Sequence, residues 1–86
     1  MAIGDVKATI RRGNQSLNDA EKSVEMASAQ LRDASALAIA TLHDSQREEA
    51  EDARQTLLAA AREVELTLRR INAAREHADA YLGAIG

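Results

Sequence analysis

The sequence predicts an all-α protein, an antiparallel hairpin of two long helices covering about residues 3–42 and 46–82. The chain has no Pro and only four Gly, three of them near its ends, so little interrupts a helix. Ala fills 19 of the 86 positions, and Leu, Ile and Val together fill 17, which favours helices with small aliphatic side chains. Apolar residues also recur at alternating steps of three and four in both halves. At this length we expect one domain over residues 1–86.

The first half carries a seven-residue repeat that predicts one long helix with a seam along it. Alternating steps of three and four meet only apolar or small residues: Ile3, Val6, Ile10, Gly13, Leu17, Ala20, Val24, Ala27, Leu31, Ala34, Ala38 and Thr41. Such a repeat is typical of a helix that packs on a neighbour throughout its length. Gly13 and Asn14 offer a possible break, with Ser16 and Asp19 able to cap a new helix. A continuous or merely bent helix is the prediction, and the break is the alternative.

The second half repeats the pattern. Its stripe runs through Ala50, Ala53, Leu57, Ala60, Val64, Thr67, Ile71, Ala74, Ala78, Tyr81 and Ile85. Ala61, Leu68 and Leu82 widen the stripe on one side. A stripe of this width usually contacts more than one neighbour.

Between the stripes, the segment 42–48 predicts a tight turn at about residues 43–45. Ser45 and Glu48 have the spacing of a capping box, which places the second helix start near residue 46. Acidic residues then crowd the first turns, where the helix dipole favours negative charge. Helices joined by so short a turn run antiparallel. One unbroken helix is the less favoured alternative.

Several large apolar residues lie outside both stripes, and they predict a partner interface. The segment 34–42 is apolar nearly all round, while the stretch 48–54 opposite it is too charged to cover it. We expect hairpins to associate, most simply as a two-fold homodimer forming a four-helix bundle, or else to bind a helical protein partner. The residues expected in this interface are Met26, Leu37, Ile39, Leu42, Leu58 and Leu66.

Charge and hydropathy argue against other classes of partner. The net charge is −3, with both signs interspersed, so we expect neither nucleic-acid binding nor attraction to an anionic membrane. The longest nearly apolar run has nine residues, whereas a membrane span needs about 20. No secretory signal pattern is visible at the N-terminus, so the expected compartment is the cytoplasm.

The residues of catalysis and metal binding are scarce, and we expect no enzyme, cofactor or metal site. The chain has no Cys, and His43, Asp44 and Ser45 adjoin in the expected turn, where turn and cap chemistry explains them. His77 has no His or carboxylate three or four residues away, although Glu76 and Asp79 flank it. A site formed by these three residues from two chains is the remaining alternative.

The layout of the whole chain resembles the WXG-type helical hairpins of type VII secretion, which also dimerise into four-helix bundles. Where that family carries Trp-x-Gly, the turn here reads Leu42-His43-Asp44-Ser45. Where it carries an acid four residues after a C-terminal Tyr, Ile85 follows Tyr81. The resemblance is one of layout and carries over no functional residue.

These observations predict a non-catalytic protein that acts through self-association and partner binding, as an adaptor, scaffold or assembly factor. The alternative, implied by the resemblance, is a type VII-like substrate or its partner, secreted without a cleaved signal peptide.

Overall fold

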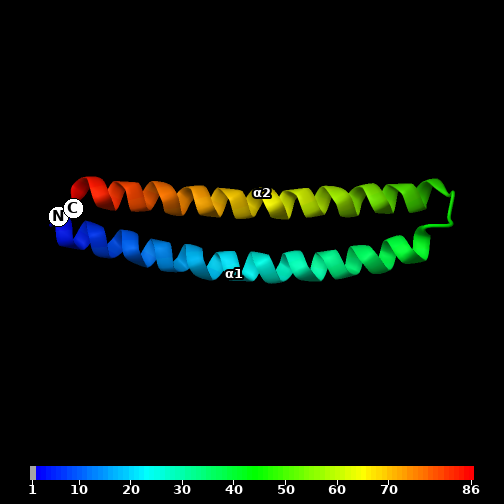
Figure 1. The fold of residues 1–86 in the computed structure, drawn as a ribbon, viewed down its shortest axis with the longest axis horizontal. Coiled ribbons are helices and arrows are strands. Elements are labelled where there is room, and N and C mark those ends of the chain that lie inside the picture. The colour runs from blue at the N-terminus through cyan, green and yellow to red at the C-terminus, as the bar shows by residue number, and fades with distance from the viewer. Residues whose placement is uncertain (1) are drawn as a thin grey trace.

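A computed structural model describes residues 2–86 as two helices lying side by side, α1 (Ile3–Leu42) and α2 (Glu48–Ile85). The helices are antiparallel, so the two ends of the chain lie together, opposite the turn (Figure 1). The hairpin is a rod of 63 × 16 × 16 Å, and the described residues include no strand. The all-α hairpin expected from the sequence is confirmed.

Helix α1 runs its 40 residues without a break, which decides between the two alternatives at Gly13. Ala2 precedes the helix in an extended conformation, and its carbonyl accepts from the amides of Asp5 and Val6. A methyl group built on Gly13 would meet no atom within 4 Å. Gly13 therefore lies beside the seam and does not bring the two helices closer together.

The connection is longer than expected, because α2 begins at Glu48 and residues 43–47 form the link. The Ser45 hydroxyl accepts from the amide of Arg47 at 3.3 Å, two residues on, and Arg47 is the N-cap without a side-chain cap bond. The expected Ser45–Glu48 capping box is wrong, because this local turn takes the hydroxyl instead. Glu48, Glu49 and Glu51 do occupy the first turn of α2.

One row of the predicted seam faces α2, and the row beside it differs from the prediction. Ile10, Leu17, Val24, Leu31 and Ala38 are all partly buried. Their seam neighbours are Asn14, Ser28 and Ser35, while the predicted Gly13, Ala27 and Ala34 are exposed, although Ala20 of that row is partly buried.

Helix α2 is rotated in the same sense toward its C-terminal end. Arg75 and Leu82 are partly buried where Ala74 and Tyr81 were expected, and Tyr81 is 51% exposed. Leu82 buries more aliphatic surface than a Tyr whose hydroxyl would need a partner, so the rotation is favourable.

The hairpin has almost no interior. Among residues 2–86 only Ala50, beside the turn, is buried, at 5% exposure. Two packed helices have a single shared seam and no third layer, so the apolar residues of the seam remain half exposed. The fold is therefore a scaffold of long surfaces.

Candidate interaction surface

Arg54 joins the two helices at the turn end of the rod. Its guanidinium donates to the carbonyl of Leu42 at 2.9 Å and to the Glu51 carboxylate at 3.0 Å. Leu42 is the last residue of α1, and its carbonyl also accepts from the Ser45 amide at 2.9 Å. Arg54 adds a second donor and a positive charge at the C-terminus of α1, where the helix dipole favours a cation.

Arg75 likewise joins α2 to α1, nearer the two chain ends. Its guanidinium, partly buried, donates to Asn18 and Glu21 of α1 and to Asn72 of its own helix. One turn further on, the Asn14 amide donates to the Asp79 carboxylate at 2.9 Å. These bonds fix the register of the hairpin, because Asn14 is level with Asp79 and Asn18 with Arg75.

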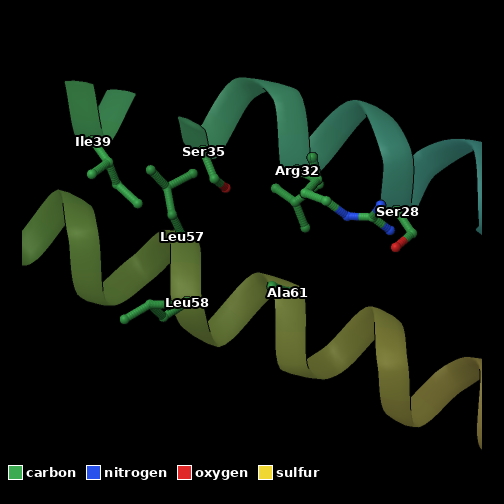
Figure 2. Close-up of a pocket in the computed structure, with 8 residues that line it drawn as sticks. Ser28, Arg32, Ser35, Ile39, Leu57, Leu58 and Ala61 are labelled. Carbon is green, nitrogen blue, oxygen red and sulfur yellow. The ribbon is translucent and has the colours of Figure 1, made fainter. Parts of the chain in front are cut away.

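A groove of about 130 Å³ opens between the helices on the same side as these bonds (Figure 2). Small-molecule pockets occupy roughly 300–1,000 Å³, so this volume suits one or two side chains better than a ligand. The Ser35 hydroxyl has no hydrogen-bond partner in the described part of the chain. The lining residues are Ser28, Leu31, Arg32, Ser35, Ile39, Leu57, Leu58 and Ala61.

The six residues predicted for the partner interface are distributed around the rod. Ile39 and Leu58 are exposed and line the groove, while Leu42 is partly buried. Met26 is 65% exposed, and the helical repeat places it on the side of α1 opposite the seam. Leu37, 72% exposed, lies toward the face of the hairpin away from the groove, whereas Leu66 lies on the side of α2 opposite the seam.

That opposite face, which we call the low-charge face, is built from four rows of residues. Each row steps by seven, and residues seven apart lie within about 20° on a helix. The two rows nearest the seam are those of Gly13 on α1 and Ala53 on α2. Each precedes a groove-side row, that of Asn14 or Arg54, by one residue, so the two rows lie about 100° apart around the helix. On α1 the rows are Val6, Gly13, Ala20, Ala27, Ala34, Thr41 and Thr9, Ser16, Ser23, Gln30, Leu37; on α2 they are Ala53, Ala60, Thr67, Ala74, Tyr81 and Glu49, Thr56, Glu63, Arg70, His77, Ala84.

The two faces differ sharply in charge. The α1 rows of the low-charge face contain no Asp, Glu, Lys or Arg, and the α2 rows contain only Glu63 and Arg70 apart from Glu49 in the first turn. The groove side carries Arg11, Glu25 and Arg32 along the corresponding row of α1. The sequence, taken at intervals of seven residues, already contains this segregation of charge. Only the structure shows which of the rows face outward.

The pKa of Glu51 lies below its ordinary value. The main cause is a hydrogen bond from the Gln55 amide, at 3.0 Å, followed by the hydrogen bonds and charge of Arg54. Each interaction favours the ionised carboxylate. The Glu51 carboxylate, whose pKa is lowered, thus belongs to the Arg54 contact at the C-terminus of α1. The sequence pattern assigns no contact between the helices to Arg54 or Arg75, although each directly follows a predicted seam position.

The histidines occupy local settings. His43 Nδ1 lies 2.9 Å from the Ala40 carbonyl, and its Nε2 lies 3.2 Å from Asp44, with both side chains exposed. Ser45 is engaged with the Arg47 amide, so these three neighbours form turn contacts. Within residues 2–86, no three His, Cys, Asp or Glu side chains gather closely enough to hold a metal, including those around His77.

No protein-family model, curated protein or solved structure matches this chain. Neither helix of the described segment combines the length and apolar character needed to cross a bilayer.

Proposed function

We propose that this chain is a non-catalytic helical-hairpin protein that works by self-association and by binding helical protein partners. Its role would be that of an adaptor, scaffold or assembly factor. The observation that carries the proposal is the missing interior, since the single buried residue among residues 2–86 cannot supply the core of an independent domain.

The exposed area supports the same conclusion. The hairpin exposes 6448 Å², whereas a compact monomer of this mass exposes about 5,000 Å². Each partner in a standard interface buries about 800 Å². The excess is thus large enough for one stable interface with surface left over.

Sedimentation equilibrium across the micromolar range tests the proposal. We expect the weight-average mass to rise from that of one chain to that of two as concentration increases. A strictly monomeric, fully helical species at every concentration would contradict self-association. Partner binding would then have to be sought by affinity capture from the native host.

A type VII-like secreted substrate, or the partner of one, is the second candidate. It is supported by the layout, two long antiparallel helices joined by a five-residue link. The test is export, because the native host should release the protein into the medium when the secretion machinery is intact. Retention in the cell regardless of that machinery would count against this candidate.

A further inference from the structure

The low-charge face is self-complementary under a two-fold rotation. Apart from Glu49 beside the turn, its only Asp, Glu, Lys or Arg residues are Glu63 and Arg70, which have opposite signs and lie in one row of α2, two turns apart. The ion pairs among residues 2–86 involve neither of them. Neither has a charged residue three or four positions away on its own helix. Both charges are therefore available to another chain.

The register of the hairpin places a small residue opposite the midpoint of this pair. Asn14 is level with Asp79 and Asn18 with Arg75, so each step forward along α1 matches one step back along α2. By this register Ala27 is level with Leu66, between Glu63 and Arg70. A two-fold axis perpendicular to the rod at that level would bring Ala20 of one chain opposite Ala34 of a second copy, and Gly13 opposite Thr41. Small residues of α1 would thus meet small residues of the other α1.

We propose that a second copy of this chain docks on the low-charge face in an antiparallel, two-fold arrangement, with the two turns at opposite ends of the dimer. This inference rests on the self-association proposed above and specifies its geometry. Helix α1 packs antiparallel on α1 of the partner about Ala27, and α2 packs antiparallel on α2 of the partner. Glu63 of each chain then lies opposite Arg70 of the other, giving two symmetric ion pairs.

Charge complementarity favours this arrangement over one with both turns at the same end. In that alternative α2 packs on α1 of the other chain, so Glu63 faces the level of Gln30 and Arg70 the level of Ser23. Both charges would then be covered by uncharged side chains, which carries a desolvation cost without compensation. The small residues of α1 also permit a close approach of the two helix axes, near the lower end of the usual 8–10 Å.

Charge reversal tests the pairing. In Glu63→Arg or Arg70→Glu alone, both ion pairs become like-charge pairs, and we expect the dimer dissociation constant to rise by at least about tenfold. An equimolar mixture of the two variants restores attraction in the heterodimer, and the double variant restores it in the homodimer. Both should recover affinity close to that of the wild type. Circular dichroism confirms that each variant keeps its helices.

Glu25→Arg is the matched control, because it reverses a charge on the groove side of α1 and should leave the dissociation constant unchanged. If the wild type dimerises but neither single reversal weakens it, or the mixture regains nothing, the docking geometry is wrong and self-association stands. If the wild type stays monomeric, the proposed self-association itself fails.

A cysteine crosslink distinguishes the two arrangements independently, since the chain has no Cys of its own. Ala27→Cys places two thiols beside the two-fold axis of the antiparallel dimer, so mild oxidation should give a covalent dimer in high yield. With both turns at the same end, the two thiols lie on diagonal helices and should not join. Met26→Cys, about 100° round α1 from Ala27 and on the side opposite the seam, is the control. Failure of Ala27→Cys to crosslink a demonstrated dimer would overturn the proposed register.

Discussion

At the scale of single residues, two arginines join the helices beside a seam that mixes large aliphatic side chains with Ala and Ser. Arg54 reaches the last carbonyl of α1, and Arg75 reaches Asn18 and Glu21. Ala and Ser in the seam bury little area, so hydrogen bonds to a charged group contribute a larger share of the helix–helix contact than in a Leu-rich hairpin.

The first prediction concerns the Glu51 carboxyl. Gln55→Ala removes the main hydrogen bond that favours its ionised form, so the pKa of Glu51 should rise toward its ordinary value. Because the pKa is lowered in the folded chain, the associated stability is present above the unfolded pKa and is lost as the pH falls through the folded one. Titration of the Glu51 side-chain carbon by NMR measures the change. Gln30→Ala is the control, and an unaltered Glu51 titration would contradict the assignment.

The second prediction concerns Gly13. Gly in a helix interior costs roughly 0.5–1 kcal/mol relative to Ala, and a methyl group at this position meets nothing within 4 Å. Gly13→Ala would also continue the row of Ala20, Ala27 and Ala34. We expect urea unfolding to show a gain of about that size. Gly83→Ala, in the last turn where helices fray, should gain less. A loss of stability would show that a neighbouring chain packs too closely on Gly13 to admit a methyl group.

At the scale of the elements, the end of α1 depends on a side chain from α2. Helix α1 has no basic residue in its last turn, so Arg54 alone supplies positive charge there. Arg54→Met keeps the aliphatic stem and removes the hydrogen bonds, and we expect a loss of about 1 kcal/mol. Hydrogen exchange should show faster opening at residues 38–42. Arg62→Met, which removes an arginine from the outer surface of α2, should change neither quantity.

The sequence predicted the helices well because helix formation here follows local composition and period. Residues 3–42 agree with α1 at both ends, whereas α2 begins two residues later and ends three residues later than predicted. The later start has a local cause, because the Ser45 hydroxyl bonds to Arg47 and delays the helix.

The orientation of the seam was harder to predict. The rows of Gly13 and Asn14 flank the same central row of α1, and hydrophobicity favours the one rich in Ala. The structure turns the other row inward, which partly buries Leu42 and Leu82 and lets Arg75 reach Glu21. Those gains depend on contacts between the helices, which periodicity in one helix does not reveal. For the same reason the sequence could indicate apolar residues outside the seam but not that Met26, Leu37 and Ile39 point in different directions.

At the scale of the whole molecule, folding and association should be a single process. A rod whose described part buries only Ala50 gains little from folding alone, whereas pairing the low-charge faces would give each helix a second neighbour. Anything that binds only the folded state raises its apparent stability in proportion to concentration. In a dimer of hairpins, each chain is the ligand that stabilises the folded state of the other.

Thermal unfolding should therefore depend on protein concentration. Using about 0.7 kcal/mol of unfolding enthalpy per residue, a coupled dimer of this size should lose roughly 4 °C in its midpoint for each tenfold dilution. Circular dichroism across the micromolar range measures the shift. The Glu63→Arg variant should melt lower than the wild type at high concentration and converge with it on dilution. A midpoint independent of concentration would mean that the hairpin is stable by its own seam, and that its exposed faces serve a partner other than itself.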